Sequence, residues 1–299
     1  MLAYWLAELG QKNIVGIEKS TIIPSDIAST AHASDFVYNT THDKLGCWAT
    51  NFSRKFYEDN GFFLKKGGLE ICRKDDDARW EELKRKVESG KAFGTNVRLI
   101  SAAEAKEKFP LLDEESIRGA MWDPDAGLVT PRSQDVVNFA VETAKEKGAL
   151  KTFTDTPAIG FEVENNRITG VKTDKGIIKT KKVVIASGIW GQLMGDMAGV
   201  PVPLMPVEHP LLFFGPLPEI QGTDELLVYP LLRDQGNSAY VRDTGRLHGG
   251  MLEWGYYEDK EPRLVDPEDI GNPEKTMISD SMRYLDLEEV AEPLEKAFE

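Results

Sequence analysis

A short apolar run that ends at a single acidic residue constrains this chain more than any other stretch. Residues 14–17 form the run, and Glu18 follows directly. This pattern is typical of a buried parallel strand with a carboxylate at its carboxyl end. A helix-favouring apolar run over residues 2–9 precedes it and ends at Gly10, a natural C-terminal cap. In dinucleotide-binding folds an acid at this place hydrogen-bonds a ribose hydroxyl, so we expect a nucleotide-binding sheet here.

Charge and composition narrow the classes of function. The 299-residue chain has a net charge of −14, which disfavours nucleic acid and anionic membranes as partners. Its sequence contains no apolar run near the ~20 residues that span a bilayer. Cys47 and Cys72 form neither a disulfide framework nor a metal cluster, so we expect a reducing, cytoplasmic location. The four histidines share no short ligand spacing, and we therefore expect no metal site.

Local signals predict the secondary structure of the first two thirds of the chain. Apolar spacing and caps predict helices over residues 44–60, 75–88, 101–109 and 131–148. Thr130 is the expected N-cap of the last of these helices. Alternating patterns predict strands over residues 158–163, 167–173 and 176–179, with Asn165 and Asn166 in the first hairpin turn. The continuous apolar run over residues 181–187 predicts a second buried strand of parallel type.

The last third of the chain has a different residue pattern. Leu-, Phe- and Tyr-rich segments alternate with turns and predict strands over residues 207–214, 226–231, 238–242 and 246–254. A helical pattern begins near residue 280. The residues alone therefore predict a nucleotide-binding α/β domain together with a mainly antiparallel β domain.

Several motifs, taken in order over nearly the whole chain, resemble a known family. They are residues 14–18, Ser-Thr-Ala-His-Ala at 29–33, Gly-Gly-Leu-Glu-Ile at 67–71, Asp-Ala-Gly-Leu-Val at 125–129, Ile-Ala-Ser-Gly-Ile-Trp-Gly at 185–191 and Pro-Val-Glu-His at 206–209. Together they resemble the dimethylglycine dehydrogenase and sarcosine dehydrogenase branch of the D-amino-acid-oxidase-like flavoproteins. The resemblance implies a Rossmann-like FAD-binding domain over residues 1–60 and 120–200. A substrate domain would then comprise residues 61–119 and 201–299.

The resemblance also assigns residues to the cofactor. Glu18 matches the acid that holds the adenosine ribose, and Lys19 follows it. His32 matches the histidine to which relatives attach FAD covalently, and the alternative is a loop histidine that only hydrogen-bonds. The remaining positions match loops and turns where backbone approaches the dinucleotide: Ser29, Thr30, Ala31, Ala158, Ser187, Gly188, Trp190 and Gly191. Asp35 departs from the family, which usually has Gly there, although Asp tolerates a left-handed backbone better than most residues.

The resemblance implies oxidation of the N-methyl C–N bond of a glycine derivative of the dimethylglycine or sarcosine type, by hydride transfer to flavin. The partner would be a small N-methylated amino acid, with oxygen or an electron-transfer protein as electron acceptor. His209 and Tyr240 match an active-site pair of the branch. A histidine there would accept the proton of the substrate ammonium, because only the neutral amine is readily oxidised. Pro210 after His209 departs from the family by removing a backbone donor. Arg233 and Arg242 are candidate partners for a substrate carboxylate, and the alternative for each is a solvated strand charge.

The family pattern extends beyond both ends of this sequence. A strand and a G-x-G-x-x-G phosphate loop would lie before Met1, and a strand with a glycine turn would follow Glu299, so we interpret the sequence as a fragment. Two alternatives stay open. The first is another amine or amino-acid oxidase, or a glycerol-3-phosphate-dehydrogenase-like substrate, since pocket residues and not the fold decide the substrate. The second is a non-catalytic or regulatory relative that does not hold FAD alone.

Overall fold

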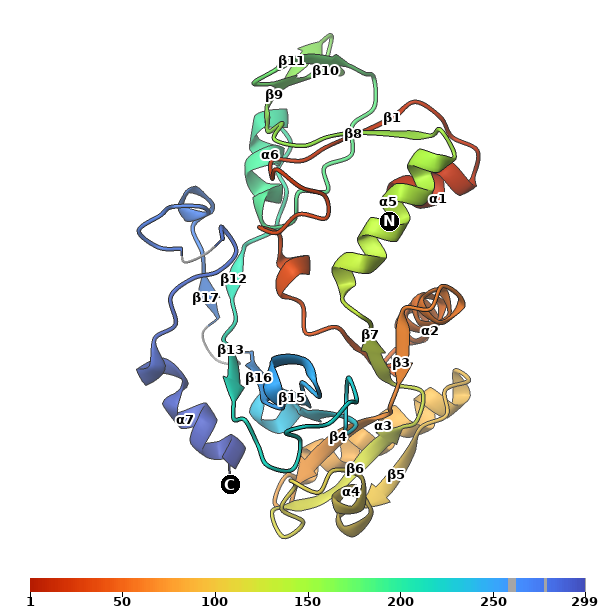
Figure 1. Cartoon of the computed structure of the whole chain (residues 1–299), viewed down its shortest axis with the longest axis vertical. Coiled ribbons are helices and arrows are strands. Elements are labelled where there is room, and N and C mark those ends of the chain that lie inside the picture. Colours follow the sequence, from red (N-terminus) through yellow and green to blue (C-terminus); the bar gives the residue numbers. More distant parts are fainter. Residues whose placement is uncertain (258–261, 277–278, 299) are drawn as a thin grey trace. The chain divides into compact units, whose positions relative to one another are not determined.

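A computed structural model describes residues 1–257, 262–276 and 279–298. The chain forms two compact units, each assembled from segments that are distant in sequence (Figure 1). The first unit comprises Met1–Ser34, Pro131–Glu208 and Leu264–Tyr284. The second unit comprises Asp35–Thr130, His209–Arg263 and Leu285–Glu299.

The two units meet after residues 34 and 130, whereas the domain boundaries expected from the sequence lie at residues 60 and 120. The difference arises from a small antiparallel sheet in the second unit, in which β2 (Phe36–Val37) and β3 (Phe63–Lys65) both pair with β7 (Gly127–Val129). Pairing through β7 draws residues 35–60 and 120–130 into the same unit as residues 61–119. Strand pairing between distant segments, which local patterns do not reveal, therefore sets the boundaries.

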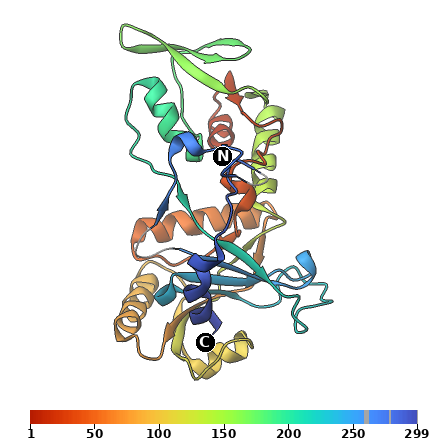
Figure 2. The same ribbon diagram turned by 90° about the vertical axis from the view of Figure 1, so that its left-hand side faces the viewer.

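The first unit has a two-stranded parallel sheet covered by two helices. Strand β1 (Ile14–Ile17) pairs with β8 (Leu150–Phe153). Helices α1 (Leu2–Glu8) and α5 (Ser133–Glu146) pack on it through a small-residue core of Ala7, Ala144, Ala149 and Leu150. The other elements are β9 (Ala158–Glu164), β10 (Arg167–Thr173), β11 (Gly176–Lys179), α6 (Gly191–Ala198) and β12 (Val207–Glu208), which pairs with β17 (Arg263–Leu264). Figure 2 shows β9–β11 as an antiparallel meander.

The second unit is organised around a seven-stranded sheet in the order β13-β16-β15-β14-β4-β6-β5. Every neighbouring pair is antiparallel except β14 and β4, which confirms the expected mainly antiparallel domain. Its strands are β4 (Gly68–Arg73), β5 (Arg98–Ser101), β6 (Ile117–Asp123), β13 (Leu211–Phe214), β14 (Leu231–Asp234), β15 (Ala239–Asp243) and β16 (Leu252–Tyr256). Its helices are α2 (Lys44–Asp59), α3 (Asp77–Ala92), α4 (Ala102–Lys108) and α7 (Leu287–Phe298).

Helices cover both faces of this sheet around β4 and β6. On one face Leu83 and Val87 of α3 pack on Cys72 and Met121. On the other face Ala105 of α4 packs among buried residues of β4, β5 and β6. Because successive strand residues point to opposite faces, β4 contributes to both layers and is buried along almost its whole length. The part of the sheet built from β14, β15 and β16 carries the residues discussed below.

Turn chemistry was predicted well. Asn165 and Asn166 both have positive φ, 51° and 59°, as a type I′ hairpin turn requires. Ser101 caps α4 by accepting a hydrogen bond from the Glu104 amide at 3.2 Å, as expected for a capping box. Asp35 has φ +63°, so the position does need the left-handed backbone that glycine adopts most easily.

The second buried parallel strand, expected over residues 181–187, does not form. In the described part of the chain β1 pairs with β8 alone, and residues 182–187 have no regular secondary structure and pair with no strand. The Val184 side chain is 65% exposed. A buried parallel strand needs hydrogen-bonded neighbours and covered faces. An apolar run indicates that a segment favours a buried position. It does not indicate whether a neighbouring strand is available to pair with it.

Other expected boundaries also moved. The strand expected over residues 226–231 is displaced to β14, because the amides of Val228 and Tyr229 donate to the Asp243 carboxylate instead of to a neighbouring strand. The strand expected over residues 207–214 is interrupted at His209 and Pro210. The N-cap of α5 is Arg132 and not Thr130, so the helix begins two residues later than expected. Among the described residues, no helix is long and apolar enough to cross a bilayer.

Candidate functional site

The loop that carries His32 is fastened on both sides of that histidine. Residues 29–32 form a 3-10 turn, η1 (Ser29–His32), which contains Ser29, Thr30, Ala31 and His32. Arg132, the residue before α5, donates from Nη2 to the carbonyl oxygens of Ala31 and Ala33, at 3.2 Å each. One guanidinium group therefore fixes the backbone before and after His32.

The surroundings of His32 favour its neutral imidazole. Partial burial lowers the pKa of His32 below its usual 6.5, and the positive charge of Arg132 lowers this pKa further. Its Nε2 lies 3.1 Å from Ser279 Oγ. An uncharged imidazole has a lone pair on one ring nitrogen, which makes it a competent nucleophile and hydrogen-bond acceptor at neutral pH.

Replacing Arg132 is expected to raise the pKa of His32. Arg132→Met removes the nearby positive charge, while Arg132→Lys keeps it, so only the methionine variant should move the pKa toward 6.5. A pKa below the unfolded value means that the neutral imidazole stabilises the fold above about pH 6.5, and this contribution is lost as the pH falls through the folded pKa. Titration of the histidine ring protons by NMR measures the pKa. Equal values in the unaltered chain and in Arg132→Met would contradict the effect of the charge.

The residues at the end of β1 meet the turn before α6. The Glu18 carboxylate accepts a hydrogen bond from the Ser20 amide at 2.8 Å, so it closes the turn after the strand. The Lys19 ammonium lies 5.0 Å from the centre of the Trp190 ring. Lys19 also forms an ion pair with Asp280. The structure therefore brings Lys19 and Trp190 together, although they are distant in sequence.

The turn before α6 has the features of a place that receives a polar ligand. Ser187, Gly188, Trp190 and Gly191 lead through a 3-10 turn into α6. Gly188 has φ +55°, and no heavy atom lies within 4 Å of the position that a Cβ would take. Ser187 Oγ and Gln192 Oε1 are buried without a hydrogen-bond partner among the described residues. A cofactor with hydroxyl and phosphate groups would satisfy such atoms, so these residues fit FAD.

Ala158 begins β9, opposite Thr173 of β10. Strand β9 contacts α6, which places Ala158 on the strand next to that helix. The cofactor residues expected from the sequence therefore all belong to the first unit. Among the described residues, no cluster of His, Cys, Asp and Glu is arranged to hold a metal ion.

Three residues at this site were not identified from the sequence. Arg132 fastens the His32 loop, Ser279 contacts His32, and Asp280 pairs with Lys19. An arginine directly before a helix was the only available signal for the first. Ser279 and Asp280 stand in an irregular segment and reach the site across about 250 positions of sequence, so no local pattern indicates them.

In the second unit, His209 and Tyr240 belong to a chain of aromatic rings. The His209 and Tyr257 ring centres are 4.6 Å apart in an edge-on arrangement. The rings of Tyr257 and Tyr240 are 5.5 Å apart, and Tyr240 meets Phe36 edge-on at 5.2 Å. The two residues of the expected catalytic pair are therefore joined through Tyr257, a residue that no sequence motif indicated.

Glycine at position 255 makes room for Tyr240. Gly255 lies directly opposite Tyr240 in the sheet, and a Cβ at that position would stand 2.0 Å from Tyr240 Cζ. Gly255→Ala is therefore expected to push the Tyr240 ring away, to cost about 1–3 kcal/mol of stability and to weaken substrate turnover. Denaturant unfolding and turnover measure the two effects. Gly236→Ala is the matched control, because a Cβ there meets its nearest atom at an ordinary 3.4 Å. Equal behaviour of the two variants would contradict the role of Gly255.

The two candidate arginines differ. Arg242 is buried and paired with the buried carboxylate of Glu253, directly opposite it in the sheet. It is therefore neither a solvated strand charge nor available to a substrate carboxylate. Arg233 is half-buried, and its guanidinium carbon lies 4.0 Å from the centre of the Tyr38 ring.

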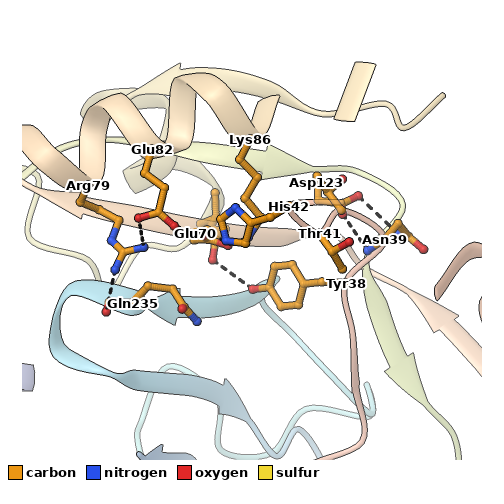
Figure 3. Close-up of polar contacts among 12 residues, drawn as sticks. Tyr38, Asn39, Thr41, His42, Glu70, Arg79, Glu82, Lys86, Asp123 and Gln235 are labelled. Carbon is orange, nitrogen blue, oxygen red and sulfur yellow. Dashed lines mark hydrogen bonds and ion pairs between the residues drawn. The ribbon is translucent and has the colours of Figure 1, made fainter. Parts of the chain in front are cut away.

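Buried polar contacts surround Tyr38 (Figure 3). The Tyr38 hydroxyl donates to the Leu69 carbonyl at 3.0 Å. Lys86 of α3 pairs with Glu70 of β4 at 2.6 Å, and both are almost fully buried. Asp123 accepts a hydrogen bond from the Asn39 amide at 2.9 Å, and burial raises its pKa. Burial also raises the pKa of Tyr38 far above its usual range, so its hydroxyl remains protonated.

Comparison with known proteins relates this fold to redox enzymes. A family model described as FAD dependent oxidoreductase matches residues 1–287. The chain is 28% identical over 268 residues to mitochondrial sarcosine dehydrogenase of Homo sapiens, covering 85% of this chain and 27% of that protein. It is 25% identical over 305 residues to mitochondrial dimethylglycine dehydrogenase of Rattus norvegicus, covering 100% and 34%. It thus spans about a third of these curated relatives.

A solved structure supports the same fold. The crystal structure of L-proline dehydrogenase from P. horikoshii matches with a TM-score of 0.74 and 31% sequence identity. The match covers 88% of this chain and 67% of that chain.

Proposed function

The chain belongs to the family of FAD-dependent oxidoreductases, and on that premise we propose that it acts in the oxidation of an N-methylated glycine. The substrate is of the dimethylglycine or sarcosine type. The observation that carries this proposal is the His32 loop, in which a clamped, neutral imidazole lies in the same unit as the other cofactor residues. The similarity to sarcosine and dimethylglycine dehydrogenases supports the choice of substrate.

Residues of the first unit would hold the ribose, the phosphates and the flavin ring of FAD. Glu18, which follows β1 at its carboxyl end, would accept hydrogen bonds from a ribose. Ser187, Gly188 and Gly191 offer a hydroxyl and a close backbone approach. His32 would be the residue that bonds to the flavin ring or contacts it. Bound FAD supplies the acceptor for a hydride equivalent.

The chain's own residues prepare the substrate. His209 accepts the proton of the substrate ammonium, which restores the nitrogen lone pair from which oxidation proceeds. Tyr240, linked to His209 through Tyr257, orients the amine. Loss of a hydride from the N-methyl carbon leaves a positively charged imine. Addition of one water then yields formaldehyde, the demethylated amine and a proton.

An absorption spectrum of the purified chain tests the cofactor, and substrate-dependent reduction of a dye tests the reaction. We expect flavin bands together with activity on dimethylglycine or sarcosine, and no activity on glycerol 3-phosphate. Oxygen consumption compared with dye reduction identifies the electron acceptor. Activity on L-proline alone would contradict the proposed substrate class, although the chain would still be an FAD-dependent oxidoreductase. A soluble chain that takes up no added FAD would overturn the proposal for this chain and favour a regulatory relative.

A further inference from the structure

The His32 imidazole has a second support besides the clamp on its loop. Arg132 holds the backbone of that loop, because it donates to the carbonyl oxygens of residues 31 and 33. The ring itself still rotates about χ1 and χ2 unless a further contact fixes it. Its Nε2 lies 3.1 Å from Ser279 Oγ, which lies 3.3 Å from Ser281 Oγ. A hydroxyl group is both a donor and an acceptor for an imidazole nitrogen, so Ser279 limits the rotation of the ring.

Ser279 begins a turn that is fastened to other parts of the first unit. The Met282 amide donates to the Ser279 carbonyl oxygen at 3.0 Å. The next residue, Arg283, forms an antiparallel bridge with Thr276 and an ion pair with Glu208 of β12. Backbone and side-chain contacts therefore hold the turn in place.

Asp280, the second residue of this turn, connects it to the end of β1. Asp280 pairs with Lys19, whose ammonium lies over the Trp190 ring. The side chains of Lys19 and Asp280 are 48% and 24% exposed. Ion pairs with this exposure contribute little to the stability of a fold, so this contact can be removed without unfolding the unit. Consecutive residues of one turn thus contact two of the expected cofactor residues, Lys19 and His32.

We propose that Ser279 is the positioning residue of His32, which it holds in the orientation that the flavin ring requires, and that the Lys19–Asp280 pair keeps Ser279 in place. This inference rests on the proposed function and adds the group that orients the histidine. A ring that rotates freely spends part of its time turned away from its target, and a fixed approach removes that loss. Flavin that bonds to His32 would attach more slowly without Ser279, and flavin that only contacts His32 would bind more weakly.

The variants Ser279→Ala and Ser279→Thr test the role of the hydroxyl. NMR of the FAD-free chain should show shifted ring-proton resonances of His32 in Ser279→Ala and nearly unchanged ones in Ser279→Thr. With FAD added, Ser279→Ala should slow the appearance of acid-stable flavin roughly 2- to 10-fold, because one neutral hydrogen bond contributes about 0.5–1.5 kcal/mol. If the flavin stays extractable, the dissociation constant for FAD should rise by the same factor. Ser279→Thr keeps the hydroxyl and should restore most of the loss.

The variant Asp280→Asn tests how Ser279 is held. It should have a smaller effect of the same kind, and it should have no further effect in the Ser279→Ala background, because the ion pair acts through Ser279. Asp269→Asn is the matched control, since it breaks the 2.6 Å ion pair with Lys275 in the same segment of the first unit. This control should leave the His32 resonances and FAD uptake unchanged.

The outcomes separate this inference from the proposed function. Unchanged His32 resonances and unchanged FAD uptake in Ser279→Ala would overturn the role of Ser279. Faster attachment or tighter binding in that variant would also overturn it, since the turn would then compete with the flavin. Equal losses from Asp280→Asn in both backgrounds would refute the link through Ser279.

The proposed function can fail while this inference holds. A chain that takes up FAD and oxidises no amine would refute the proposed function, and FAD uptake that still depends on Ser279 would uphold the positioning role. If the chain takes up no FAD, the His32 resonances alone decide whether Ser279 holds the ring.

Discussion

A His32→Ala variant is expected to release all its flavin into the supernatant on acid precipitation, while the unaltered chain keeps flavin in the pellet. The reason is chemical. Attachment needs a nucleophilic ring nitrogen, and the pKa of His32 is lowered by burial and by Arg132, so the imidazole is uncharged at neutral pH. The Arg132 hydrogen bonds on either side also hold the loop in one conformation, which favours a bond that requires a fixed approach.

His42→Ala is the matched control for that experiment. His42 is exposed and lies in the second unit, where its Nε2 is 3.3 Å from a Glu82 carboxylate oxygen. Its loss should leave the flavin in the pellet. If acid releases the flavin from the unaltered chain as well, His32 is not the point of attachment. Retained flavin in His32→Ala would show that another residue forms the bond.

The local elements of this protein could be predicted because short-range physics determines them. The hairpin of β9 and β10 needs two consecutive residues with positive φ, and asparagine is one of the few residues that accept this conformation. The cap of α4 depends on Ser101 and the amide three residues later. Each of these signals lies within a few positions of the structure that it determines.

Features that depend on distant partners could not be predicted in this way. Residues 181–187 are as apolar as a buried strand, and the described residues provide no strand to pair with them. The displaced start of β14 reflects a carboxylate fifteen positions away that takes the backbone donors of residues 228 and 229. The residues of a segment determine which secondary structure it favours. Whether that structure forms depends on the segments that pack against it or pair with it.

The candidate site shows the same division. Positions such as Lys19 and Trp190 were identified by resemblance, and the structure then explains how one contacts the other. The contributions of Arg132 and Tyr257 became visible only when segments about 100 and 50 residues away were placed beside them. A residue that positions another residue belongs to no sequence motif, because its role depends on where the fold places it and not on its residue type.

The cross-strand pair of Arg242 and Glu253 gives the largest stability effect that we expect. The two residues are 4% and 2% exposed and directly opposite each other on β15 and β16. Arg242→Met leaves a buried carboxylate without its cation, and Glu253→Leu leaves a buried guanidinium without its anion. Each single change is expected to lower the free energy of unfolding by about 3–5 kcal/mol, measured by urea denaturation.

The double variant Arg242→Met/Glu253→Leu should recover most of that loss, because it removes both charges and fills the space with apolar atoms. This recovery of stability, together with unchanged substrate turnover in the double variant, distinguishes a structural ion pair from a pair kept for substrate binding. The exposed pair of Lys55 and Asp59 on α2 is the control, and its variants should not change stability measurably. Single variants of the buried pair that unfold no earlier than Lys55→Met would show that solvent still reaches these charges. Arg242 would then again become a candidate for the substrate.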